Sequence, residues 1–385
     1  MANPANHGVL GNARVVLADR VIERGWVEFA EGQIVAFGEG QPRASYVDFA
    51  GDLLIPGLVE LHTDHLEAHY MPRPKVFWDP VAAVLSYDAS LATCGITTVL
   101  DSLRLWRDDG ADQIGRESAL LADAIAAARD TGMLRADHFL HLRCEVPMPD
   151  VVAEASEMIR RSDVRLLSLM DHTPGQRQFR NEEKLRTYYR GKTGGMTDAE
   201  LDVLFAKRLD YAGLHAARNY RALVDLAGAR GVPLASHDDT TLDHVAQSVR
   251  DGVAIAEFPT TLEAAQALHA GGVRVLMGAP NLVRGGSHSG NIGTAELAQA
   301  GVLDVLSSDY VPQSLLMGAL QLPHLVSGSD LASSVRTVSK TPAEAVGLID
   351  RGEITVGRRA DLVRVNIRRE LPVVRTVWCA GERVA

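Results

Sequence analysis

The chain has 385 residues and a formal net charge of −10 at neutral pH. Hydrophobic residues make up 46% and charged residues 23%, proportions that are typical of a globular protein with a large core. Because surfaces that bind nucleic acid or anionic membranes need a basic footprint, this acidic balance argues against both as partners.

The cysteines and the apolar stretches indicate the compartment. Cys94, Cys144 and Cys379 are odd in number and show no CxxC spacing, so we expect no disulfide framework and a reducing environment. The first residues lack the pattern of a secretion signal. There is no run of about 18 apolar residues, the length that a membrane-spanning helix needs. We therefore expect a cytoplasmic protein.

The two ends of the chain have the same character. Residues 10–55 read as short strands of alternating pattern separated by glycines, and residues 352–385 repeat this pattern. We predict a small β-sandwich domain built from both termini, residues 1–56 and 346–385.

The middle of the chain alternates apolar runs with helical stretches. The apolar runs cover residues 57–64, 95–103, 138–146, 164–172, 232–239, 253–260, 273–281 and 303–310. Strands that alternate with crossover helices form parallel sheets, and eight such units close a barrel. We predict a (β/α)8 barrel over residues 57–345.

Nearly every predicted strand ends in a polar residue. These residues are Asp64, Asp101, Glu145, His172, His237, Glu257, Asn281 and Asp309. In a barrel of this kind the active site lies at the carboxyl ends of the strands. The polar ends therefore predict one shared site at the mouth of the barrel.

Six of the strand-end side chains form a candidate metal centre. His62 and Asp64 are two residues apart on a strand, so they share a face. The six expected ligands are His62, Asp64, Glu145, His172, His237 and Asp309. Imidazole and carboxylate ligands suit one or two divalent ions, zinc first, with manganese or iron as alternatives, and Glu145 is the candidate bridge between two ions.

Some alternatives stay open at this site. A lone buried histidine is more often a core residue than a ligand. Asp171 rather than His172 could turn inward, and Glu257 could be a ligand or an orienting group. His65, directly after the first motif, could contact the ligands without binding metal.

Several longer motifs resemble a known family. They include "PGLVELHTDHLEAHYMPRP", "MDHTPGQRQF", "ASHDD" and "GAPNLVRGGSHSGN", and with the shorter ones they run from residue 56 to 312. The order of HxD, bridging Glu, His and last-strand Asp resembles the amidohydrolase superfamily. The longer motifs resemble its branch that acts on a ribose triphosphate in phosphonate breakdown by the carbon–phosphorus lyase pathway. His65 departs from the Asn expected in some relatives.

The resemblance implies a reaction and a general base. A 5-triphosphate of ribose 1-methylphosphonate would be hydrolysed to the 5-phosphate and pyrophosphate, with water as the nucleophile. Asp309 would be the catalytic residue that takes the proton of that water.

The sequence after the fourth predicted strand independently suits a polyphosphate. Residues 173–195 carry a net charge of +4 within an acidic chain. Arg177, Arg180 and Lys184 are the first candidates for phosphate contacts, because guanidinium groups bind phosphate with two donors and lysine supplies a point charge. The alternative is a solvated helix of mixed charge.

The glycine-rich loop after the seventh predicted strand is the second candidate phosphate site. Its glycines allow backbone N–H groups to point at an anion. The expected contacts are Arg284, Gly286, Ser287 and His288, and His288 could instead be the general acid. A plain glycine turn is the alternative.

Two rival functions use the same fold. A metal-dependent amidohydrolase that cleaves a C–N bond would need the same ligands but no basic segment. A scaffold without catalysis would be expected to lose at least one ligand. From size and class we expect a homodimer.

Overall fold

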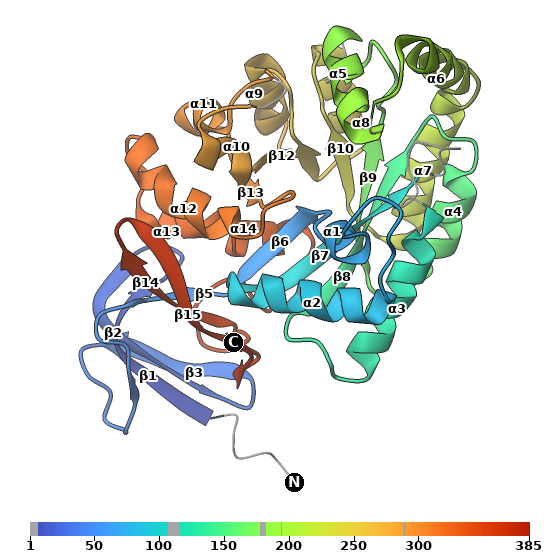
Figure 1. The fold of residues 1–385 in the computed structure, drawn as a ribbon. Helices are drawn as coiled ribbons and strands as arrows, with labels where there is room; N and C mark the ends of the chain where they lie inside the picture. Colours follow the sequence, from blue (N-terminus) through green and yellow to red (C-terminus); the bar gives the residue numbers. More distant parts are fainter. Residues whose placement is uncertain (1–6, 107–115, 178–181, 194, 288–289) are drawn as a thin grey trace.

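The computed structural model describes residues 7–106, 116–177, 182–193, 195–287 and 290–385. It has a barrel and a smaller sheet domain in which the first and last strands lie together (Figure 1). Among the described residues, no helix has both the length and the apolar character needed to cross a membrane.

The eight predicted barrel strands are all present and in the predicted order, which confirms the fold class. They are β6 (Leu58–Thr63), β7 (Ile96–Leu105), β8 (Asp137–Glu145), β9 (Val164–Met170), β10 (Leu234–His237), β11 (Ile255–Glu257), β12 (Arg274–Gly278) and β13 (Val305–Ser307). Each pairs in parallel with the next. The apolar runs of the sequence are buried because helices cover the outside of a barrel and side chains fill its inside.

The inner core forms a floor beneath the strand ends. It includes Val59, Leu100, Leu166, Ile255 and Leu276, each from a different strand. These side chains fill the barrel, so polar groups at the strand ends lie over a closed apolar layer.

Helices follow the strands around the barrel. They are α1 (Leu66–Tyr70), α2 (Pro80–Thr93), α3 (Ser118–Asp130), α4 (Val151–Met158), α7 (Ala217–Arg230), α8 (Leu242–Arg250), α9 (Leu262–Ala270), α10 (Ala279–Arg284), α11 (Thr294–Gln299), α12 (Ser314–Leu325), α13 (Leu331–Arg336) and α14 (Lys340–Ala345). Thr241 and Thr261 cap α8 and α9 by accepting from backbone N–H groups, and Gly231 ends α7 in the left-handed conformation.

The barrel closes through contacts that matter for the site. Thr63 of β6 bridges to Asp309, just after β13, and the Asp309 N–H donates to the His62 carbonyl at 3.2 Å. The Ser307 hydroxyl also donates to Glu60 at 2.8 Å. Closure therefore places the last strand end beside the first.

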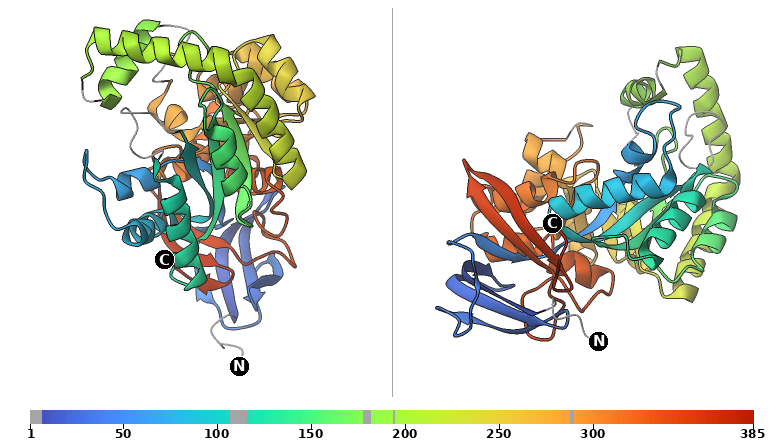
Figure 2. Two further views of the ribbon diagram at one scale, coloured as in Figure 1. Left: turned by 90° about the vertical axis from the view of Figure 1, so that its right-hand side faces the viewer. Right: turned by 60° about the horizontal axis from the view of Figure 1, so that its bottom comes forward.

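The terminal strands build one mixed sheet. It contains β1 (His7–Val16), β2 (Val21–Ala30), β3 (Gln33–Glu39), β4 (Val47–Asp48), β5 (Leu53–Pro56), β14 (Leu362–Arg368), β15 (Leu371–Cys379) and β16 (Glu382–Arg383). Antiparallel pairing of β5 with β14 joins the two ends of the chain. The sheet has its own core, which includes Val27, Phe29, Phe49 and Trp378, and it lies to one side of the barrel (Figures 1 and 2).

A helical insertion follows β9. It consists of α5 (Glu182–Thr193), α6 (Asp198–Tyr211) and the π-helical turn η4 (Ala212–Ala216), which runs into α7. Leu185, Tyr189, Leu201 and Phe205 pack together between α5 and α6. The insertion lies at one end of the barrel (Figures 1 and 2). In the sequence it continues past the basic segment 173–195, through α6 and η4 to residue 216.

Candidate metal centre

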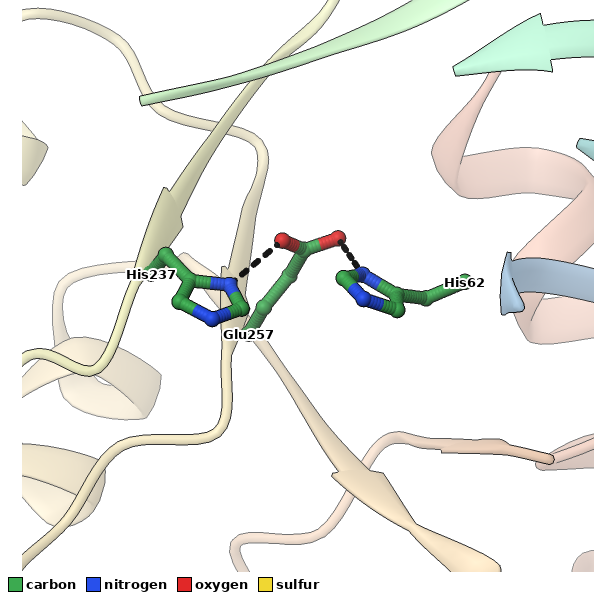
Figure 3. A group of neighbouring side chains, drawn as sticks. All are labelled: His62, His237 and Glu257. Carbon is green, nitrogen blue, oxygen red and sulfur yellow. Dashed lines mark hydrogen bonds and ion pairs between the residues drawn. The ribbon is translucent and has the colours of Figure 1, made fainter. Parts of the chain in front are cut away.

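Glu257 at the end of β11 joins two of the expected ligands. One carboxylate oxygen lies 2.8 Å from His62 Nδ1 and the other lies 3.1 Å from His237 Nδ1. Figure 3 shows the carboxylate between the two imidazoles. All three side chains are buried. Since a carboxylate can only accept, both rings carry their proton on Nδ1 and leave Nε2 available.

Glu145 and His172 form a second carboxylate–imidazole pair. Glu145 accepts from the His172 backbone N–H at 2.8 Å and lies 2.6 Å from His172 Nδ1. Both of its oxygens are thus engaged, so a bridging role would require Glu145 to give up at least one of these bonds. Asp171 instead accepts from the Thr173 N–H at 3.0 Å, and it is His172 that turns toward Glu145.

The three imidazoles therefore share one arrangement, with Nδ1 held by a buried carboxylate. Histidines that bind metal commonly donate their other ring N–H in this way, which fixes the tautomer and the ring orientation. Two groups of side chains bring their potential ligand atoms within 4.8 Å of one another. One is His62, His237 and Glu257, and the other is His172, His237 and Asp238.

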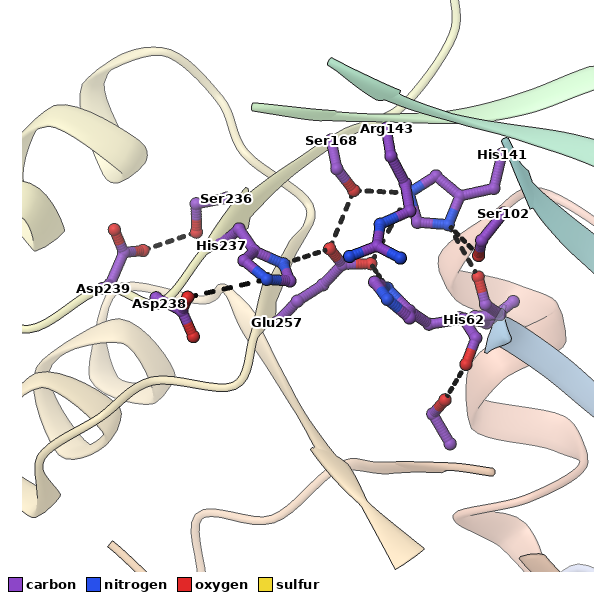
Figure 4. Close-up of polar contacts among 12 residues, drawn as sticks. His62, Ser102, His141, Arg143, Ser168, Ser236, His237, Asp238, Asp239 and Glu257 are labelled. Carbon is purple, nitrogen blue, oxygen red and sulfur yellow. Dashed lines mark hydrogen bonds and ion pairs between the residues drawn. The ribbon is translucent and has the colours of Figure 1, made fainter. Parts of the chain in front are cut away.

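A buried polar chain supports Glu257 from below. The Ser168 hydroxyl lies 2.8 Å from Glu257 and also contacts Nε2 of His141, so its single proton serves one of these two acceptors at a time. The Nδ1–H of His141 donates to the Leu61 carbonyl at 3.0 Å (Figure 4). Burial lowers the pKa of His141 to about 3, so this ring is neutral. Burial alone would raise the pKa of Glu257, but His62 and the hydrogen bonds from His62 and His237 hold that pKa well below its usual range.

Asp64 and Asp309 meet where the barrel closes. Burial first and the Asp64 carboxylate second raise the pKa of Asp309 to about 7, while Arg143 opposes this shift. Arg143 Nη1 lies 3.4 Å from Asp64. The expected base is therefore beside the first motif, and its pKa is close to neutral pH.

Sequence reasoning missed Arg143. Its side chain is buried, and its Nε has no hydrogen-bond partner in the described part of the chain. The alternation of side chains along β8 indicates it, because His141, Arg143 and Glu145 are spaced by two residues and share one face of the strand. Figure 4 shows its guanidinium near Glu257 and His62.

Arg177 holds the loop that follows β10. Its Nη1 donates to the His237 carbonyl at 2.6 Å and to Asp239 at 2.7 Å. Of the other phosphate candidates in this segment, Arg180 and the side chain of Lys184 lie outside the described residues. Arg186 and Arg190 of α5 pair with Asp202 and Asp198 of α6.

The segment after β12 corrects one expectation. The seventh strand does not end at Asn281, because Pro280 starts helix α10 and Gly285 ends it at φ 80°. Asn281 accepts from the Thr294 N–H at 3.0 Å. Arg284 and Gly286 are exposed, and Ser287 is half-buried. His288 lies outside the described residues.

The barrel and this cluster of histidines and carboxylates define the class of protein. The model of the amidohydrolase family matches residues 155–384, and the chain belongs to this family. Over 379 residues it is 45% identical to the alpha-D-ribose 1-methylphosphonate 5-triphosphate diphosphatase of Escherichia coli (strain K12), covering 98% of this chain and 100% of that one.

Solved structures share the fold at much lower identity. The N-acetyl-D-glucosamine-6-phosphate deacetylase D267A mutant from Mycobacterium smegmatis is 18% identical, with a TM-score of 0.63 over 98% of this chain and 99% of that chain. The 5-methylcytosine deaminase from Klebsiella pneumoniae is 17% identical, with a TM-score of 0.65 over 98% of each chain. At these identities the likeness shows the fold alone.

Proposed function

We propose that this chain is a metal-dependent diphosphatase of phosphonate breakdown. It hydrolyses the 5-triphosphate of α-D-ribose 1-methylphosphonate 5-triphosphate to the 5-phosphate and pyrophosphate. The observation that carries this proposal is the 45% identity to a diphosphatase of that substrate along the full length of both chains.

The donor set fits one or two divalent ions. Three buried imidazoles are held at Nδ1 by the carboxylates of Glu257 and Glu145. This mixture of nitrogen and oxygen donors suits zinc, with manganese or iron as alternatives. The residues that would hold the ions are His62, Asp64, His172, His237 and Asp309, with Glu145 as the expected bridge. A bound ion would supply Lewis acidity and lower the pKa of water toward about 7.

Asp309 is the proposed general base. A base works best when its pKa is near the operating pH, and, in the chain without metal, burial beside Asp64 raises the pKa of Asp309 from its ordinary value. The carboxylate would take the proton of the attacking water as the phosphoanhydride bond breaks. The phosphate group on the far side of that bond leaves with its electron pair, and the products are the 5-phosphate and pyrophosphate whichever of the two phosphorus atoms is attacked.

Basic groups would bind the triphosphate. The buried guanidinium of Arg143, 3.4 Å from Asp64, is one group that could also bind an anionic substrate. The other proposed contacts are Arg177, Arg180, Lys184, Arg284, Gly286, Ser287 and His288. Arg177 already donates to the His237 carbonyl and to Asp239, so a contact with phosphate would have to use its other N–H groups or replace one of these bonds.

The compartment and the assembly stay predictions. The three cysteines are buried and unpaired with one another, which fits the proposed cytoplasmic location. A homodimer is still expected from size and class.

A substrate comparison tests the proposal. The protein is stripped with a chelator, reloaded with zinc, manganese or iron, and offered the ribose triphosphate and N-acetyl-D-glucosamine 6-phosphate separately. We expect metal-dependent pyrophosphate release and no acetate. Acetate release without pyrophosphate would instead identify a C–N hydrolase.

A further inference from the structure

Asp238 is a buried carboxylate that the proposed reaction has not yet used. It follows His237 directly at the end of β10 and is 3% exposed. Its backbone N–H donates to the Glu257 carbonyl at 2.8 Å, which fixes its position. Its Oδ2 has no hydrogen-bond partner among the described residues. A buried carboxylate oxygen without a partner is costly, so this atom needs an explanation.

Two imidazole nitrogens face that oxygen. Asp238 Oδ2 lies 3.6 Å from His237 Nε2 and 4.0 Å from His172 Nε2 (Figure 4 shows the first pair). Both separations exceed the 2.7–3.2 Å that is typical of N–H···O bonds, so neither contact is a hydrogen bond. The atoms are near each other but too far apart to satisfy one another directly.

The Nδ1 atoms of His237 and His172 are both engaged with carboxylates. Glu257 lies 3.1 Å from His237 Nδ1, and Glu145 lies 2.6 Å from His172 Nδ1. In a neutral imidazole only one nitrogen carries a proton, so a ring with its proton on Nδ1 can offer Nε2 to a metal ion. The two Nε2 atoms and the Asp238 carboxylate oxygen therefore face one another across a common place.

The spacing fits a cation at that place. Zinc binds imidazole nitrogen and carboxylate oxygen at about 2.0–2.2 Å, so two ligands of one ion lie no more than about 4.4 Å apart. Both separations from Asp238 fall within this limit. All three donors are buried.

We propose that Asp238 is a metal ligand and that it forms one metal position with Nε2 of His172 and Nε2 of His237. In this arrangement Glu145 and Glu257 hold the imidazoles at Nδ1, and for Glu145 this positioning role takes the place of the bridging role expected from the sequence. Three protein ligands leave a fourth position open, as in catalytic zinc sites, and this position is available to water or a phosphoryl oxygen. The inference rests on the proposed function only in that the reaction needs a divalent ion.

The conformation of Asp238 makes a clean substitution possible. Its φ is 56°, in the left-handed region that asparagine and aspartate tolerate better than other side chains. Asp238→Asn therefore keeps the backbone and the shape and removes the negative charge. Asp171→Asn is the matched control, because Asp171 is also adjacent to a proposed histidine ligand but bonds the Thr173 N–H instead.

The test is zinc binding to the metal-free protein, without any assay of activity. Wild type and both variants are stripped, titrated with zinc by calorimetry, dialysed and analysed for metal content. We expect Asp238→Asn to lose at least about tenfold in affinity for one ion per chain, the scale seen even for residues that only support ligands. Asp171→Asn should bind zinc as wild type does. Equal affinity of Asp238→Asn and wild type, or no zinc binding by wild type, would overturn the proposal.

Thermal unfolding gives a second, independent readout. Without metal, Asp238→Asn should be as stable as wild type or more stable, because the substitution removes an unpartnered buried charge. With saturating zinc the order should reverse, since the ion stabilises the state that binds it more tightly. A variant that is already less stable without metal, or that fails to fold, would contradict the proposal. Loss of zinc by Asp238→Asn in a protein whose wild type does not cleave the triphosphate would support the metal position and refute the diphosphatase.

Discussion

His62 and Glu257 are 195 residues apart in the chain, yet Nδ1 of the imidazole lies 2.8 Å from the carboxylate. The first motif of the barrel is thereby tied to the end of the sixth strand. The second oxygen of Glu257 holds His237 in the same way, at 3.1 Å. A single buried carboxylate thus sets the tautomer of two imidazoles on different strands.

Replacement of Glu257 by glutamine should disrupt this pairing. An amide has one accepting oxygen, and its NH2 group can only donate, so at least one of His62 and His237 must change tautomer and present an N–H in place of a lone pair. We expect zinc affinity to fall by about 10- to 100-fold, measured by titration of the metal-free protein. Ser168→Ala removes a supporting bond but leaves both imidazole contacts, and it should bind zinc nearly as wild type does. Unchanged affinity in Glu257→Gln would refute the positioning role.

Asp309→Asn should separate catalysis from metal binding. The amide cannot accept the proton of water, and loss of a general base typically lowers the rate by about 10²- to 10⁴-fold. The backbone should be preserved because φ is 53°, which asparagine tolerates. Turnover of the triphosphate and metal content are measured on the same sample. A wild-type rate in the metal-loaded variant would remove Asp309 from the role of base.

Arg177→Ala should destabilise the protein as well as weaken substrate binding. Asp239 is buried, and without the guanidinium at 2.7 Å its charge would be left with the hydroxyl donors Ser236 and Ser248 and no cation, a change that commonly costs about 3–5 kcal/mol. Arg186→Ala, which breaks a more exposed pair with Asp202, should cost no more than about 1 kcal/mol. Chemical denaturation of both variants provides the comparison. Similar losses in the two would mean that Arg177 does not hold the loop.

His138 should make stability depend on pH. Burial lowers its pKa, but Asp101 at 2.9 Å and Asp88 at 3.3 Å reverse this and raise the pKa to about 9 from 6.5. The folded state therefore binds a proton that the unfolded state releases, and the stabilisation is complete below pH 6.5 and lost as the pH rises through 9.

The free energy of unfolding is measured at several pH values from about 6 to about 10. This interval spans the pKa of His138 in the unfolded state, 6.5, and in the folded state, about 9. His138→Gln cannot titrate, so its free energy of unfolding should change less over this interval, whatever its absolute stability. The same slope in variant and wild type would show that other groups cause the dependence.

The sequence predicted the barrel, because apolar runs that alternate with helical stretches report the positions of the strands. It predicted the strand ends less well, since Asp101 lies inside β7 beside His138 and Asn281 lies in α10. It could not assign Asp238 or fix the role of Glu257. The inward turn of Asp238 depends on a positive φ, and the bonds of Glu257 come from strands distant in sequence. The helical period was equally unable to separate the inserted α5 and α6 from the crossover helix α7, since all three satisfy the same spacing.

The most direct test of the central claim is time-resolved phosphorus NMR of the metal-loaded protein with α-D-ribose 1-methylphosphonate 5-triphosphate. The account predicts that pyrophosphate and the 5-monophosphate appear together in equal amounts and that neither forms once the metal is removed. Release of orthophosphate in place of pyrophosphate, or an unchanged spectrum from a sample shown to contain metal, would contradict it.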